Sequence, residues 1–200
     1  MDDVFRSINK LVLIAMVFYS KACHPSYWFD EVAMTIGKET DSRVEMQQYS
    51  LDFKWNKNEP LHYSDTYSID YATELNLLYL DSTIGSDQAR SKSGSDHAYG
   101  LALVPILSVH SSNTVLGVTP YTEIGLGAGW LSTDTLEKKT NSAIDLGSNV
   151  QFRILAGAGF KFGIDNRFTL RYRFIHHSNG NLASINEALN FHTLGFSYRY

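Results

Sequence analysis

Apolar and polar residues alternate along most of the chain after residue 26, with the two-residue period of β-strands. In residues 150–162, one face carries apolar side chains, while the other carries glutamine, arginine, glycine and lysine. The alternation predicts eight strands, which lie near 27–38, 42–55, 63–81, 97–110, 115–133, 148–163, 167–178 and 190–200. The chain is therefore expected to be an all-β protein.

The strands favour a transmembrane barrel over a soluble sandwich or barrel. Several reach about ten residues or more, the length that a tilted strand needs to cross the hydrocarbon of a bilayer. Charges recur within the polar faces, where acids and arginines can pair inside a polar lumen; they are Asp70, Glu74, Glu123, Arg153, Arg171 and Arg173. The faces expected to meet lipid carry Tyr71, Leu75, Leu77, Phe152, Ile154, Leu170 and Phe174. We therefore predict an eight-stranded antiparallel transmembrane β-barrel.

Aromatic residues and loop lengths agree with this fold. Aromatics near strand ends suit the interfacial girdles of outer-membrane barrels; they include Trp28, Tyr49, Trp55, Tyr79, Trp130, Tyr198 and Tyr200. The long polar connections are 82–96, 134–147 and 179–189, and the shorter ones are 56–62, 111–114 and 164–166. Long loops outside and short turns inside are typical of an outer-membrane protein.

Composition and charge exclude several classes of protein. The mean hydropathy of −0.20 is too low for a bundle of transmembrane helices. The formal net charge of −4 comes with no basic patch, so nucleic acid is not an expected partner. A single cysteine, Cys23, rules out a disulfide within the chain.

Residues 1–22 have the pattern of an export signal. A weakly positive region and an apolar stretch at 11–18, too short to span a bilayer, precede small residues suited to cleavage after residue 22. Residues 23–200 would then form the mature barrel. A short N-terminal core helix is the alternative interpretation, and lipidation of Cys23 is a minor one.

The candidate chemistry lies at the end of the seventh predicted strand. Its apolar row from Phe168 to Phe174 continues with His176 and Ser178, because alternate residues share a face. An imidazole beside a serine hydroxyl is the base–nucleophile pair of acyl transfer. Asn190 of the last strand falls on the same face, where a third group would orient the histidine. At a lipid-facing rim, such a group of residues would attack a substrate that lies in the membrane.

A simpler interpretation also fits these residues. Strand ends and outer loops are rich in His, Ser and Asn because these residues suit turns. A serine two residues after a histidine is a common pair, so the pattern alone does not establish catalysis.

Three stretches resemble the PagL-type outer-membrane lipid A 3-O-deacylases. They are residues 120–127 (PYTEIGLG), residues 152–162 (FRILAGAGFKF), and the run His176-His177-Ser178-Asn179 with Asn186 downstream. The last combination is the most specific. The resemblance spans roughly the mature chain. It implies an eight-stranded barrel that hydrolyses the ester-linked acyl chain at position 3 of lipid A, without metal or cofactor, through a Ser-His-acid triad on its outer surface.

Position by position, the resemblance implies that His176 is the base and Ser178 the nucleophile, with Asn186 in the oxyanion hole. The family's acid falls on Asn190, which can orient an imidazole but supplies no negative charge. Glu187 is therefore the alternative acid.

Backbone and side-chain amides between the last two strands are the further oxyanion candidates; they include Asn179 and Gly180. The glycine that the family has two residues after its Ser-Asn pair is Asn181 here. This difference leaves the geometry of the oxyanion hole open.

The implied partners are lipid A or lipopolysaccharide as substrate, with the lipids of a Gram-negative outer membrane around the barrel. Family members can dimerise, so a homodimer is one arrangement to test. A structural or surface-interaction barrel without activity is the rival hypothesis, and Asn190 favours it. A soluble lipocalin-like binder, with apolar faces turned inward, is a third. Another acyl ester, such as a phospholipid, is an alternative substrate.

Overall fold

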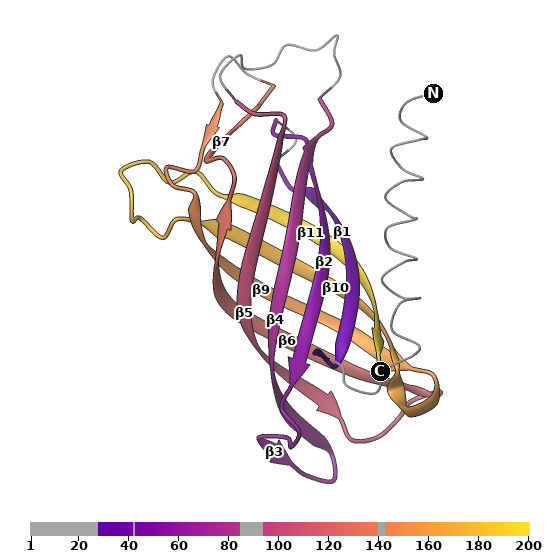
Figure 1. Cartoon of the computed structure of the whole chain (residues 1–200). Coiled ribbons are helices and arrows are strands. Elements are labelled where there is room, and N and C mark those ends of the chain that lie inside the picture. Colours follow the sequence, from indigo (N-terminus) through magenta and orange to yellow (C-terminus); the bar gives the residue numbers. More distant parts are fainter. Residues whose placement is uncertain (1–27, 42, 85–93, 140–142) are drawn as a thin grey trace.

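The computed structural model describes residues 28–41, 43–84, 94–139 and 143–200, which form a closed antiparallel β-barrel (Figure 1). Its eight long strands are β1 (Glu31–Glu39), β2 (Met46–Asn56), β4 (Tyr67–Ser82), β5 (His97–Ser111), β6 (Val118–Leu131), β9 (Val150–Phe162), β10 (Phe168–Ser178) and β11 (Leu189–Arg199). Each strand pairs with the next, and β1 pairs with β11, so this sheet has no free edge. The predicted fold class is confirmed.

All eight predicted strands are present, with ends shifted by a few residues. The third was predicted to begin at residue 63, but His62 and Tyr63 form a short strand, β3, that folds back on the start of β4. The connection between β6 and β9 holds a hairpin of β7 (Thr135–Leu136) and β8 (Ile144–Asp145). A short 3-10 turn, η1 (Ile164–Asn166), joins β9 to β10. Alternation does not predict two-residue strands, because they are too short to show a period.

The longer and the shorter connections lie at opposite ends of the barrel. The long connections gather at one end together with β7, and the shorter turns lie at the other end with β3 (Figure 1). We assign the long-loop end to the outer face of the membrane, since this is the usual arrangement of such barrels. No helix in the described ranges is long and apolar enough to cross a membrane. The predicted export signal and Cys23 lie outside the described residues.

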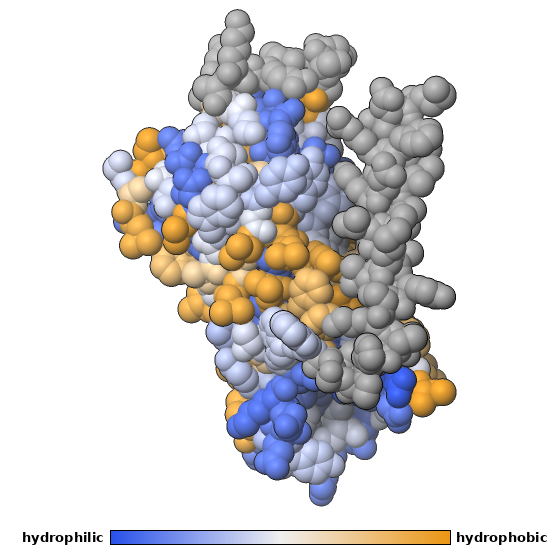
Figure 2. Space-filling model, in the orientation of Figure 1, coloured by the Kyte–Doolittle hydropathy of each residue, from blue (hydrophilic) through white to orange (hydrophobic). Residues whose placement is uncertain are grey.

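The outer wall of the barrel is apolar. Leu77, Ile154 and Leu170 are 44%, 48% and 42% exposed, although aliphatic side chains of this size are usually buried in soluble proteins. Figure 2 shows the apolar residues as a band around the middle of the visible face, with hydrophilic surface towards both ends. Such a band matches the hydrocarbon of a bilayer. A soluble lipocalin-like binder would turn these faces inward, so that alternative is wrong.

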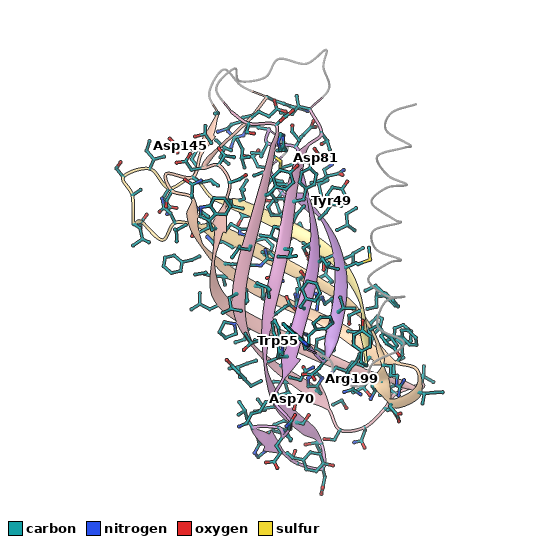
Figure 3. All side chains as sticks on the ribbon, in the orientation of Figure 1. Tyr49, Trp55, Asp70, Asp81, Asp145 and Arg199 are labelled. Atoms are coloured by element: carbon teal, nitrogen blue, oxygen red, sulfur yellow. The ribbon has the colours of Figure 1, made fainter. Side chains whose placement is uncertain are left out.

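Aromatic residues lie towards both ends of the wall. Tyr49 is near the long-loop end, whereas Trp55 lies towards the opposite end (Figure 3). Tyr49, Tyr79 and Tyr99 sit in register on β2, β4 and β5, with ring centroids 6.3 and 5.1 Å apart. These positions suit interfacial girdles, because tyrosine and tryptophan combine an apolar body with a polar tip.

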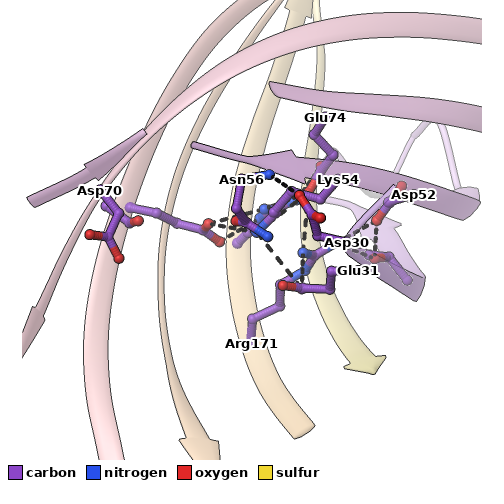
Figure 4. Close-up of polar contacts among 12 residues, drawn as sticks. Asp30, Glu31, Asp52, Lys54, Asn56, Asp70, Glu74 and Arg171 are labelled. Carbon is purple, nitrogen blue, oxygen red and sulfur yellow. Dashed lines mark hydrogen bonds and ion pairs between the residues drawn. The ribbon is translucent and has the colours of Figure 1, made fainter. Parts of the chain in front are cut away.

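The barrel lumen holds a buried network of ion pairs. Arg173 contacts Glu74 at 2.7 Å and Glu123 at 2.6 Å, and all three side chains are nearly inaccessible. Arg171 reaches Glu74 at 3.2 Å and Asp52 at 2.5 Å, a cluster drawn in Figure 4. These contacts confirm that the predicted charged faces point inward and that acids pair with arginines.

Glycine makes room for this network. A Cβ atom on Gly157 would lie 2.8 Å from Cγ of Arg173 and 2.6 Å from the carbonyl oxygen of Tyr172. Any larger residue would push the arginine stem off the barrel wall. The glycines of β9 therefore allow long charged side chains to lie flat inside a narrow barrel.

The interior towards the long-loop end contains a cluster of apolar side chains, which the predicted polar lumen did not include. Leu80, Leu155, Ile175 and Phe191 point inward there and are almost fully buried. Leu136, Ile144 and Leu146 of the β7–β8 region join the same core. A loop that covers this end excludes water, so apolar side chains gain free energy by packing inside it.

Candidate active site

The last two strands of the barrel, β10 and β11, bring His176 and Asn190 together. His176 of β10 pairs in register with Asn190 of β11, and Nδ1 of the imidazole lies 2.7 Å from Oδ1 of the asparagine. Both side chains are half-buried. With the proton on Nδ1, the ring donates to the asparagine carbonyl and keeps the lone pair of Nε2 as a base.

Ser178 is the last residue of β10 and lies on the same face as His176, two residues further along. It pairs with Phe152 of β9 and is 9% exposed. Within the described residues, His176 and Ser178 share no hydrogen bond. A serine hydroxyl turns freely about χ1, and catalytic hydrogen bonds often tighten only when substrate is bound. The two side chains are thus neighbours on the outer face but form no hydrogen bond with each other within the described residues.

The loop between β10 and β11 is ordered by asparagines. Asn186 Oδ1 accepts the backbone N–H of Asn179 at 2.9 Å, and its Nδ2 donates to Oδ1 of Asn181 at 2.9 Å. Asn179 is fully buried, and its Nδ2 donates to the carbonyl oxygens of Leu146 and Ile185. The Asn186 side chain therefore shapes the turn, and its amide nitrogen keeps a second N–H that forms no hydrogen bond within the described residues.

The backbone N–H of Gly180 is one donor that this loop leaves available next to Ser178. Among the described residues, its N–H has no acceptor, whereas the N–H groups of Asn179 and Asn181 both donate hydrogen bonds. Gly180 and Asn181 both have φ of 64°, a left-handed pair that turns the chain directly after Ser178. A Cβ atom on Gly180 would lie 2.7 Å from the Phe152 ring, so the glycine is required on two grounds.

Glu187 contacts other parts of the loop region. Its Oε1 lies 3.1 Å from Nζ of Lys138, and its Oε2 accepts the backbone N–H of Asp145 at 2.6 Å. The backbone N–H of Glu187 also donates to the carbonyl oxygen of Asp145 at 3.1 Å. Glu187 thus ties the loop after Ser178 to the β7–β8 hairpin, and the structure brings Asn190 to His176 instead.

A second Ser-His-Asp group lies inside the opposite end of the barrel and was not predicted. His110 Nε2 is 2.8 Å from Oγ of Ser108 and 3.1 Å from Oδ2 of Asp70. In a catalytic triad, one ring nitrogen takes the serine proton while the acid binds the other ring nitrogen. Here Ser108 and Asp70 both contact Nε2, so His110 does not have this arrangement. The ring is also buried against Tyr121 on the luminal face. The outer His176 site is therefore the better candidate.

A second polar pair lies on the outer face next to the His176–Asn190 pair, further from the long-loop end. His192 Nδ1 is 2.5 Å from the hydroxyl of Tyr172, and the two rings stack 5.8 Å apart. His192 pairs in register with Phe174, next to the His176–Asn190 pair. The described residues contain no group of three or more His, Cys, Asp or Glu side chains that could hold a metal ion.

Comparison with known proteins gives the family. Residues 47–199 match the family model described as lipid A 3-O-deacylase (PagL). The crystal structure of the outer membrane enzyme PagL superposes with a TM-score of 0.69 at 19% identity, covering 85% of this chain and 99% of that one. Neisserial surface protein A gives a TM-score of 0.47 at 11% identity, with 85% and 95% covered. No curated protein matches the sequence. Because the family model spans most of the barrel, the chain belongs to the PagL family of lipid A 3-O-deacylases.

Proposed function

We propose that the protein is an outer-membrane esterase that removes the acyl chain at position 3 of lipid A, with Ser178 as nucleophile and His176 as base. The observation that carries this proposal is the 2.7 Å contact between His176 and Asn190, on the outer face beside Ser178 in a PagL-family barrel. A base oriented next to a serine at the lipid boundary suits an ester that is itself part of the membrane.

The chemical steps follow from the positions of these groups. His176 Nε2 takes the proton of Ser178 as Oγ attacks the ester carbonyl, and the N–H of Gly180 donates to the oxyanion that forms. The imidazolium returns the proton to the departing sugar hydroxyl, which leaves an acyl-serine. Water then hydrolyses this ester with the same base, releasing a fatty acid and free Ser178.

The outer wall supplies a surface for the acyl chain. A hollow of about 630 Å³ lies at β6, β9 and β10, and its apolar lining includes Pro120, Ala158, Phe160, Leu170 and Leu194. It lies further along β10 from Ser178, towards the short-turn end of the barrel. A hydrocarbon chain fits such a surface because apolar area is buried without loss of hydrogen bonds.

Mass spectrometry of lipid A tests the proposed function. Cells that express the protein should lose one acyl chain from lipid A, and cells that express the Ser178→Ala variant at equal outer-membrane levels should not. Unchanged lipid A in both would favour the rival hypothesis of an inactive structural barrel. Loss of an acyl chain from phospholipid instead would assign another ester substrate.

The Asn190→Glu variant should turn over lipid A about three to ten times faster than wild type. A carboxylate stabilises the imidazolium better than an amide does, and amide substitution of the acid costs about four orders of magnitude in serine proteases, mainly through the wrong histidine tautomer. The gain is smaller here because the Asn190 carbonyl already accepts from Nδ1. Steady-state kinetics on purified lipid A in detergent measure this, and a slower variant would contradict the assignment.

The Glu187→Gln variant should retain more than about a tenth of wild-type activity. Glu187 acts on the loop through Lys138 and Asp145, and glutamine can still accept the Asp145 N–H. The same kinetic assay decides between the two assignments of the acid. Complete loss of activity in folded Glu187→Gln, with no gain in Asn190→Glu, would make Glu187 the acid.

A further inference from the structure

Glu39 lies beside the candidate site, although it comes from the first strand of the barrel and precedes residues 47–199, the segment that the family model matches. It is the last residue of β1 and pairs in register with Phe191, the neighbour of Asn190 on β11. Its side chain is buried, with 5% exposed. A carboxylate therefore stands next to the position where this chain lacks the family's acid.

The Glu39 carboxylate accepts three hydrogen bonds. Its Oε2 accepts the backbone N–H of Asn190 at 2.7 Å, and its Oε1 accepts the N–H of Asp41 and the hydroxyl of Thr40, each at 3.2 Å. The N–H of Thr40 in turn donates to the carbonyl oxygen of Asn190 at 2.8 Å. The end of β1 thus holds the backbone of Asn190 on both sides, while the asparagine side chain contacts His176.

A charged side chain is not needed to accept the hydrogen bond from the Asn190 backbone. A neutral acceptor would satisfy the Asn190 N–H at a lower desolvation cost. Burial disfavours the ionised form of Glu39, and the three donors offset part of that cost because an ionised carboxylate is purely an acceptor. Among the described residues, no lysine or arginine forms an ion pair with Glu39. No ion pair with a lysine or arginine of the described residues therefore neutralises a charge on Glu39.

We propose that Glu39 is a positioning residue that supplies, through Asn190, the negative charge that the family's acid provides directly. When Ser178 attacks an ester, its proton moves to Nε2 of His176, and the ring becomes an imidazolium with protons on both nitrogens. Glu39 belongs to the inward-facing row of β1 and binds the backbone N–H of Asn190, so its charge acts on the ring across the backbone of Asn190. It stabilises the imidazolium and favours the uncharged tautomer with its proton on Nδ1. This inference rests on the proposed esterase function.

A double-substitution experiment tests the role of the charge. Glu39→Gln should lower kcat for lipid A about tenfold with KM unchanged, and Glu39→Asp should restore most of the loss, because it keeps the charge. In the Asn190→Glu background, Glu39→Gln should change kcat by less than about twofold, because a carboxylate then contacts the ring directly. Equal losses in both backgrounds would overturn the proposal, since a purely structural defect does not depend on residue 190.

Glu45→Gln is the matched control. It removes the same charge from the neighbouring loop, where Glu45 pairs with Lys139 at 2.5 Å, away from His176. Its kcat should stay within about twofold of wild type. A tenfold loss in Glu45→Gln would show that any acid at this rim has the same effect, and would overturn the specific role of Glu39. Heat-modifiable migration on SDS gels confirms that each variant is a folded barrel.

A measurement that does not depend on catalysis tests the role of Glu39 separately from the esterase function. ¹⁵N NMR of histidine-labelled protein in detergent micelles measures the tautomer ratio of the uncharged His176 ring. Glu39→Gln should lower the fraction with the proton on Nδ1, changing the ratio about tenfold. An unchanged ratio would overturn the role of Glu39, whether or not the protein is active. A changed ratio in a protein that leaves lipid A intact would support Glu39 and reject the esterase function.

Discussion

The Ser178→Ala variant is expected to insert and fold as wild type and to lose at least about a thousandfold in kcat for lipid A. Removal of the nucleophile from a serine triad costs about six orders of magnitude in the best-studied case, and the remaining rate comes from binding and the oxyanion donors. Folding should not change, because Ser178 ends β10 and its hydroxyl forms no hydrogen bond within the described residues. Fatty-acid release from purified lipid A in detergent measures the loss.

Ser108→Ala is the matched control for this loss. Ser108 belongs to the luminal group around His110, which also presents serine next to histidine. Its replacement should leave kcat within about twofold of wild type. Full activity in folded Ser178→Ala, together with loss in Ser108→Ala, would move the nucleophile to the lumen and contradict the outer site.

The Arg173→Met variant is expected to lose about 3–5 kcal/mol of unfolding free energy, or to fail to insert. Arg173 pairs with both Glu74 and Glu123 at 2.7 and 2.6 Å, and removal of one partner from a buried pair leaves uncompensated charge in the barrel interior. Urea unfolding in detergent, followed by tryptophan fluorescence, measures the change.

Arg167→Met gives the comparison for this loss of stability. Arg167 is exposed in the turn before β10, where it donates a 3.4 Å hydrogen bond to Tyr198. Its replacement should shift the unfolding free energy by less than about 0.5 kcal/mol. Equal unfolding midpoints for Arg173→Met and wild type would mean that the luminal network does not stabilise the barrel.

Several features of the fold could be predicted because they are local. The inward direction of Glu74, Arg171 and Arg173 follows from alternation alone, since each strand residue points opposite to its neighbours. The same rule places His176 and Ser178 on one face. The apolar interior near Leu80 and Phe191 was not predicted, because its burial depends on a loop that covers the barrel end.

In the candidate site, too, some features could be predicted from local pattern and others depend on the tertiary structure. The pairing of His176 with Asn190 agrees with the prediction that both lie near one rim, because the last two strands are joined by a single loop. The role of Glu187 could not be predicted from its place in that loop. Its partners, Lys138 and Asp145, belong to a hairpin whose fold alternation does not indicate.

The sequence by itself determined which residues face lipid, which face the lumen and how many strands form the barrel, because a two-residue period is a property of each strand. Only the tertiary structure brought Glu39 to the backbone of Asn190. Glu39 and Asn190 are 151 positions apart and meet only where β1 closes the barrel against β11. The register of that closing pair depends on all the strands between them, and no local pattern encodes it.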